Sequence, residues 1–138
     1  CMQLKYGIGA SIIFVNQQNQ VLLLLRDDKP DIPFPNHWDV LGGHVEENET
    51  PAECIVREMM EELSFNIESP TLFKIYHQEE KIEYTFWQQE DFDIDAITLN
   101  EGQRLQWFSR EEIEAMPADA IAYEFHSILL EFFDFLSA

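Results

Sequence analysis

Residues 42–65 read GGHVEENETPAECIVREMMEELSF and carry the clearest helix signal in the chain. Thr50 and Glu53 have the spacing of a capping box, and a proline occupies the first helical position between them. This pattern predicts a helix over about 51–63 that ends at Ser64.

The side chains of this predicted helix separate into two arcs at about 100° per residue. The packing face is expected to consist of Ala52, Ile55, Val56, Met59, Met60 and Leu63. The opposite arc carries Cys54, Glu58, Glu61 and Glu62. Glu53 and Arg57 lie at its edge with i and i+4 spacing, which would allow them to form an ion pair.

The three glutamates of the second arc oppose helix stability. Like charges at i and i+4 weaken a helix by a few tenths of a kcal/mol, roughly, and the macrodipole disfavours acids in the C-terminal half. A solvated acidic face is the simplest interpretation. However, a Gly-Gly loop precedes the helix and lets a ligand approach the backbone closely. Clustered carboxylate oxygens are ligands for Mg²⁺ or Mn²⁺, so we expect a divalent-cation site here.

The rest of the chain has the pattern of a mixed α/β protein. Strands are expected at 7–15, 20–26, 37–41, 72–77, 82–88 and 105–108. The first two of these, and the fourth and fifth, are predicted to form hairpins, and the third is predicted to end at Gly42-Gly43. A second capping box opens a short helix after Ser109, and an amphipathic helix is expected over 119–136. Strands flanked by helices predict a sheet covered on both faces.

Length and charge restrict the classes of protein. The 138 residues match one domain, so residues 1–138 are expected to form a single unit. A net charge of -19 opposes binding to a nucleic acid polymer or to an anionic membrane surface. The longest aliphatic run, 21–25, is far shorter than a bilayer span, and no secretory signal opens the sequence. We therefore expect a cytoplasmic protein with a small-molecule partner.

The spacing of residues around the acidic helix resembles a known motif. Gly43 and Glu49, followed by Arg57-Glu58-Met59-x-Glu61-Glu62 and Phe65, look like the box of the nudix hydrolases. Ser64 stands where the family pattern has glycine, a change that affects the loop after the helix and removes no metal ligand. The order of elements is similar to the nudix α/β/α sandwich with a mixed central sheet.

Two further segments resemble the MutT-like branch of that family. Glu101-Gly102-Gln103, followed by Trp107, looks like the segment that supplies a further glutamate to the metal site. Pro117-Ala118-Asp119 resembles the place where that branch contacts the base, often through asparagine. Asp119 is therefore a candidate for substrate binding, although its different side chain leaves the base preference open.

The resemblance also implies roles for individual residues. Glu58 and Glu62 would be the principal metal ligands, with Glu61 nearby and the carbonyl of Gly43 contributing. Glu101 would be a further ligand or a base, although a solvated loop carboxylate is the alternative. Arg57 would orient the glutamates through Glu49 or Glu53.

Two residues outside the box are candidates for substrate binding on their own chemistry. Arg26 ends a buried strand and could reach a phosphate, or could form a surface ion pair. Trp38 could stack on a base, but an aromatic residue entering a strand more often belongs to the core.

The family implies that water attacks a phosphorus atom of a nucleoside diphosphate derivative. The expected function is Mg²⁺-dependent cleavage of a nucleoside triphosphate, standard or oxidised, to a monophosphate and pyrophosphate, with Mn²⁺ as an alternative ion. Hydrolysis of a nucleotide sugar or of ADP-ribose is the nearest alternative. A nucleotide-binding module without turnover and a purely structural acidic domain are alternatives of other classes. The sequence predicts neither the base, nor the leaving group, nor the oligomeric state.

Overall fold

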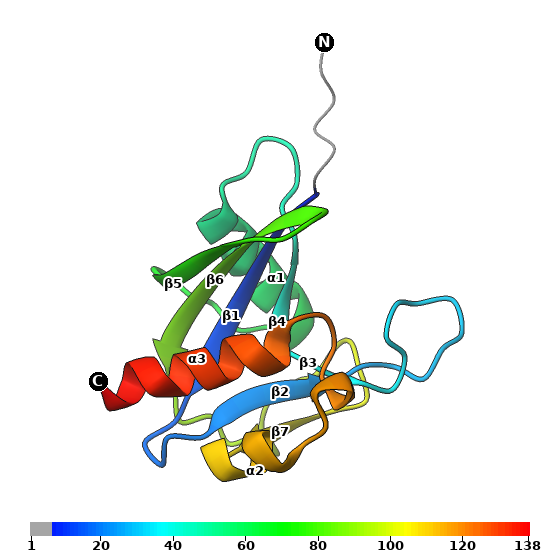
Figure 1. Ribbon diagram of the computed structural model, residues 1–138. Coiled ribbons are helices and arrows are strands. Elements are labelled where there is room, and N and C mark those ends of the chain that lie inside the picture. Colours follow the sequence, from blue (N-terminus) through cyan, green and yellow to red (C-terminus); the bar gives the residue numbers. More distant parts are fainter. Residues whose placement is uncertain (1–6) are drawn as a thin grey trace.

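The computed structural model describes residues 7–138, in which seven strands form one mixed sheet (Figure 1). The strands are β1 (Gly7–Val15), β2 (Val21–Leu25), β3 (Trp38–Asp39), β4 (Leu41–His44), β5 (Thr71–His77), β6 (Lys81–Gln89) and β7 (Arg104–Phe108). Their order is β3-β2-β1-β6-β5, while β4 pairs with β1 and β7 pairs with β2.

Strand β1 lies at the centre of the sheet. It pairs in parallel with β6 along its whole length, from Gly7 opposite Lys81 to Val15 opposite Gln89. Its other edge pairs antiparallel with β4 from Gly9 to Ile12. The predicted hairpin between β1 and β2 is therefore wrong in most of its length, because β4 occupies this edge and leaves β2 only the pair at Val15.

Strand β2 instead pairs with β7 and β3, both antiparallel. The predicted strand 37–41 is divided at Val40 into β3 and β4. Gly42 and Gly43 lie within β4 and do not end a strand as predicted. The predicted hairpin of β5 and β6 is confirmed, with a register irregularity between Leu72 and Lys74.

The helices are α1 (Pro51–Leu63), α2 (Arg110–Ala115) and α3 (Phe125–Ser137), with a 3-10 turn, η1 (Ala118–Ala120), before the last. Both predicted capping boxes are present, at Thr50 and at Ser109. The C-terminal helix begins at Phe125, later than predicted from the apolar spacing. The preceding chain bonds to the sheet instead: the Ala122 N–H donates to the Trp38 carbonyl at 2.7 Å, and Tyr123 has a φ of 55°.

Helices cover both faces of the sheet, as predicted for an α/β/α sandwich. Figure 1 shows α3 lying across the near face and α1 behind the sheet. Alternate side chains of β1 enter the two cores: Ile12 and Phe14 pack with α1, whereas Ile13 and Val15 pack with α3.

The buried face of α1 is rotated relative to the predicted one. Cys54 and Glu62 are buried, whereas Met60, expected in the packing face, is 46% exposed. The small side chain of Cys54 fits beneath β4, where its thiol donates to the His44 carbonyl at 3.4 Å. This rotation carries Glu62 into the interior.

Candidate functional site

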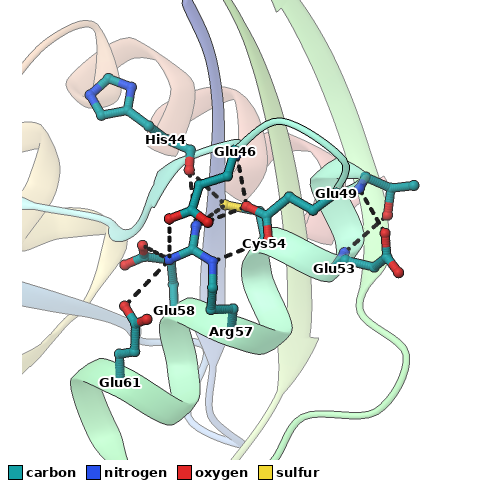
Figure 2. A network of polar contacts seen from close by, with 9 residues as sticks. His44, Glu46, Glu49, Glu53, Cys54, Arg57, Glu58 and Glu61 are labelled. Carbon is teal, nitrogen blue, oxygen red and sulfur yellow. Dashed lines mark hydrogen bonds and ion pairs between the residues drawn. The ribbon is translucent and has the colours of Figure 1, made fainter.

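Arg57 stands at the centre of a network of acidic side chains (Figure 2). Its guanidinium donates two hydrogen bonds to Glu49, at 2.8 and 3.1 Å, and one to Glu58 at 2.8 Å. It also donates to Glu61 at 3.3 Å and to the His44 carbonyl at 3.1 Å. Arg57 thus joins the loop before α1 to the glutamates on the helix.

The expected pairing of Arg57 with Glu49 is present, and the one with Glu53 is absent. The Glu53 carboxylate instead accepts a hydrogen bond from the Thr50 N–H at 2.8 Å and completes the capping box. Hydrogen bonds from Arg57, and then from the Glu46 N–H, lower the pKa of Glu49 to about 2. Glu49 is therefore ionised and fixes the guanidinium in place.

Glu58 lies directly against Gly43 of β4. A Cβ atom built on Gly43 would come within 2.6 Å of Glu58 Oε1, so only glycine leaves room for this carboxylate. Burial raises the pKa of Glu58, and the negative charges of Glu61 and Glu101 add to the rise against the opposing effect of Arg57.

Glu62 is the most deeply buried acid of α1, with 5% of its surface exposed. Its Oε2 atom has no hydrogen-bond partner among the described residues, 7–138. Burial raises its pKa to about 9, and the charges of Glu58, Glu101 and Asp39 contribute in that order. A buried carboxylate without a partner costs free energy, which a cation or a proton would recover.

Glu101 reaches this group of acids through a contact that the sequence pattern did not reveal. The neighbouring Asn100 donates its backbone N–H to the Glu62 carbonyl and its side-chain amide to the Glu61 carbonyl, both at 2.8 Å. These bonds satisfy carbonyls at the C-terminal end of α1 and hold the loop against it. Asn100 could have been suspected only as a polar residue beside Glu101.

The donor set of these glutamates fits a divalent cation in chemistry. It offers hard carboxylate oxygens, one of them unpartnered and buried, beside a glycine that leaves room for Glu58. Across residues 7–138, no three acidic, histidine or cysteine side chains already converge on one point. The glutamates are thus neighbours that do not form a closed cage.

A cavity of about 260 Å³ adjoins this acidic group through Gly43, which belongs to both. Arg26 lines it, as does Asp39, and the two form an ion pair at 2.8 Å. Burial raises the pKa of Asp39 to about 6, although Arg26 opposes the rise. Arg26 therefore forms an ion pair, although with a buried partner and not at the surface as expected.

The other two candidates for substrate binding lie away from the cavity wall. The Trp38 ring packs against Phe108 at 4.8 Å, and Arg104 lies 5.2 Å from its centroid. Asp119 lies in η1, and Tyr123 and Phe125, further along the chain, line the cavity instead. The structure thus groups Arg26 with the cavity but neither Trp38 nor Asp119, and the binding roles of all three stay predictions.

Comparison with known proteins identifies the family. The model of the NUDIX domain matches residues 5–127, and the chain therefore belongs to the NUDIX domain family. A crystal structure of a MutT protein from Methanosarcina mazei superposes with a TM-score of 0.76 at 23% identity, covering 99% of each chain. This likeness confirms the predicted nudix-type fold.

Two curated relatives are similar over part of the chain. A putative 8-oxo-dGTP diphosphatase of Bacillus subtilis is 34% identical over 73 residues, 53% of this chain and 45% of the relative. A dihydroneopterin triphosphate diphosphatase of Haemophilus influenzae is 33% identical over 73 residues, 53% of this chain and 42% of the relative. The matched part thus spans less than half the length of either relative. Within residues 7–138, no helix has the length and apolar character required to cross a membrane.

Proposed function

We propose that this chain is a Mg²⁺-dependent pyrophosphohydrolase that cleaves a nucleoside triphosphate, standard or oxidised, to a monophosphate and pyrophosphate. The observation that carries the proposal is the buried, unpartnered Oε2 of Glu62, in a group of acids that adjoins a cavity through Gly43. Membership of the NUDIX domain family and relatives named as diphosphatases of triphosphates support it. Mn²⁺ is the alternative ion.

The proposed ligands are the carboxylates of Glu58, Glu61, Glu62 and Glu101, with the carbonyl of Gly43. A bound divalent cation would neutralise phosphate charge and lower the pKa of a bound water. Without it, the net charge of -19 would repel a triphosphate.

The chain itself supplies orientation. Arg57 holds Glu58 and Glu61 through its hydrogen bonds, and Glu49 fixes Arg57 by two more. We propose Arg57 as a positioning residue and Glu101 as a further ligand or as the base that accepts the proton of the attacking water. Asn100 would hold Glu101 in reach of α1.

A product assay with Mg²⁺ tests this function and its alternatives. Nucleoside triphosphates, nucleotide sugars, ADP-ribose and dinucleoside polyphosphates are incubated with the full chain, and products are separated by chromatography. Release of pyrophosphate and a monophosphate from a triphosphate is the expected result. Conversion of ADP-ribose or a nucleotide sugar alone, to two monophosphates, would favour the nearest alternative and overturn the proposal.

The matched variants are Glu62→Gln and Glu79→Gln. The first removes one carboxylate from the proposed metal site, and turnover should be nearly abolished. The second removes one from an exposed turn between β5 and β6, and turnover should be unchanged. Nucleotide binding with Mg²⁺ and no hydrolysis over hours would instead identify a binding module. A Glu62→Gln variant with most of its activity would overturn the metal assignment.

We also propose that residues 1–138 form one domain and that the partner is a small molecule. The family match over residues 5–127 and the two cores that share one sheet support the first statement. The cytoplasmic location stays a prediction.

A further inference from the structure

The cavity beside the acidic group contains a second buried ion pair that the proposed reaction does not use. Glu83 of β6 lines the cavity and is 4% exposed, and its Oε1 lies 3.3 Å from Lys81 Nζ. A Cβ atom built on Gly9 of β1 would collide with this carboxylate, so glycine at that position leaves the space it occupies. Lys81 also lines the cavity.

Burying this carboxylate is costly unless its oxygens are bonded. Among residues 7–138, Lys81 is the one cation within ion-pair distance of Glu83, and its shortest contact is to Oε1. A carboxylate offers about four lone-pair sites over two oxygens, so acceptor capacity is left facing the cavity. Lys81 likewise has three N–H donors, only one of which Glu83 can use well.

The two side chains together present an ordered pattern to a ligand. Both residues line the cavity, and Lys81 Nζ lies closer to Glu83 Oε1 than to Oε2, which gives the order donor, first acceptor, second acceptor. The complementary ligand edge is an acceptor followed by two adjacent donors. A 2-amino-4-oxopyrimidine ring has this edge in its carbonyl oxygen, ring N–H and exocyclic amino group.

Guanine and the pterins share this ring edge, whereas the other standard bases do not. Cytosine and adenine offer one donor group beside ring acceptors, and uracil and thymine offer one N–H between two carbonyls. Such bases would leave Glu83 with an unbonded oxygen or face Lys81 with a donor, which costs free energy in a buried site. Tyr123 and Phe125 supply aromatic rings in the same wall, beside Lys81, whose Nζ lies 4.2 Å from the Tyr123 centroid.

We propose that Glu83 and Lys81 are the specificity-determining pair of this chain, and that they select triphosphates carrying a 2-amino-4-oxopyrimidine ring. The proposal rests on the proposed function, since it assumes that the cavity holds the ring of the triphosphate substrate. Gly43 supports this, because it joins the cavity to the carboxylate group. Oxidation of guanine at C8 does not change this edge, so the pair would bind both forms.

Equilibrium binding tests the pair separately from turnover. Calorimetric titration of the full chain uses GMP, neopterin monophosphate, CMP and AMP as probes, with Mg²⁺ present so that the net charge of -19 does not oppose the phosphate. We expect GMP or neopterin monophosphate to bind at least about tenfold more tightly than CMP and AMP. Preference for GMP identifies a purine pocket and preference for the neopterin phosphate a pterin pocket, and either supports the proposal. Equal binding of all four, preference for CMP or AMP, or no measurable binding would overturn it.

Variants then assign the preference to the pair. Glu83→Gln keeps the size of the side chain but replaces one acceptor with a donor, and should reduce the preference at least about tenfold. Lys81→Gln should weaken binding of the carbonyl-bearing rings, and Glu79→Gln, exposed in the preceding turn, should leave it unchanged. A wild-type preference that survives both cavity substitutions would overturn the assignment.

Turnover distinguishes failure of this inference from failure of the proposed function. Hydrolysis of dGTP and dihydroneopterin triphosphate is compared with that of dATP and dCTP, as kcat/KM. Turnover of triphosphates without regard to the ring would contradict the specificity pair while the proposed function stands. Selective binding of GMP without turnover of any triphosphate would contradict the proposed function and leave the pair supported.

Discussion

The carboxylate of Glu58 occupies the space above Gly43 that any other residue would fill with its Cβ atom. An ideal Cβ at this position would lie 2.6 Å from Glu58 Oε1 and 2.9 Å from Oε2. The glycine of β4 and the glutamate of α1 are therefore matched across the two elements. The contact brings the helix and the sheet together at a residue that also lines the cavity.

Gly43→Ala should lower kcat/KM by about a hundredfold, because a carboxylate displaced by about 1 Å no longer has the geometry needed for catalysis. The folded state should persist, since the contact is with the movable end of a side chain and not with backbone. Steady-state kinetics and thermal unfolding measure the two effects. Gly7→Ala is the control, because a Cβ atom there meets nothing within 4 Å. Unchanged activity in Gly43→Ala would contradict a catalytic role for Glu58.

Glu62 makes stability depend on pH in a direction opposite to that of most carboxylates. Its pKa is about 9 in the folded protein against an ordinary 4.5, so the folded state retains a proton that the unfolded chain releases. Its contribution to stability is complete below about pH 4.5 and is lost as the pH rises towards 9. Glu58 and Asp39 have raised pKa values and act in the same direction.

Glu62→Gln should therefore stabilise the metal-free protein more as the pH rises, by of the order of 2 kcal/mol at pH 7. Urea unfolding in EDTA between pH 5 and 9 measures the difference from the wild type. Added Mg²⁺ should stabilise the wild type most at high pH, where the carboxylates are ionised, and the variant much less. A difference between the two proteins that does not change with pH would show that Glu62 has an ordinary pKa.

Arg57→Lys should raise the pKa of Glu49 from about 2 towards its ordinary value, because an ammonium group cannot donate the two parallel hydrogen bonds of the guanidinium. In the wild type, Glu49 contributes stability above about pH 4.5 that is lost as the pH falls towards 2. The variant should lack most of this dependence. An NMR titration of the Glu49 carboxyl carbon measures the pKa directly.

The same variant should lower kcat, because Glu58 and Glu61 lose their common donor. Arg110→Lys provides the control, since that arginine pairs with Glu114 and Asp134 far from the acidic group in sequence. A lysine variant with wild-type kcat and a normal Glu49 pKa would confine Arg57 to a structural role.

The starts of the helices could be predicted from neighbouring residues, whereas the order of strands in the sheet depends on pairing between distant segments. The capping boxes at Thr50 and Ser109 involve atoms three residues apart, so the sequence alone specifies them. Whether β2 pairs with β1 or with β7 depends on which strand occupies the edge of β1. That strand is β4, which begins 26 residues after the end of β1, a separation beyond pattern analysis.

The residues of the site also divide into those predictable from the sequence and those that only the fold brings together. The glutamates of α1 follow from their spacing, and so does the contact of Arg57 with Glu49 at eight residues' separation, through the family motif. Lys81 and Glu83 lie two residues apart on β6 and form no distinctive sequence pattern. Only the parallel pairing with β1 places Glu83 over Gly9. Asn100 likewise acquires its role from the fold, by meeting the end of α1.

Ser64→Gly should stabilise the protein by about 0.5–1 kcal/mol, because Ser64 ends α1 with a φ of 53°, a left-handed conformation that glycine adopts without strain. The loss of the 3.3 Å contact from the Asn100 amide to Ser64 Oγ offsets part of this gain. Ser64→Ala is the matched control, since it loses the same contact and keeps the strain, and should be neutral or mildly destabilising. Urea unfolding measures the stability of all three proteins.

Activity should be unchanged in Ser64→Gly, because the Asn100 side chain still bonds to the Glu61 carbonyl and holds Glu101 near the helix. A large loss of activity in the glycine variant, with the alanine variant active, would show that the strained turn itself positions Glu101.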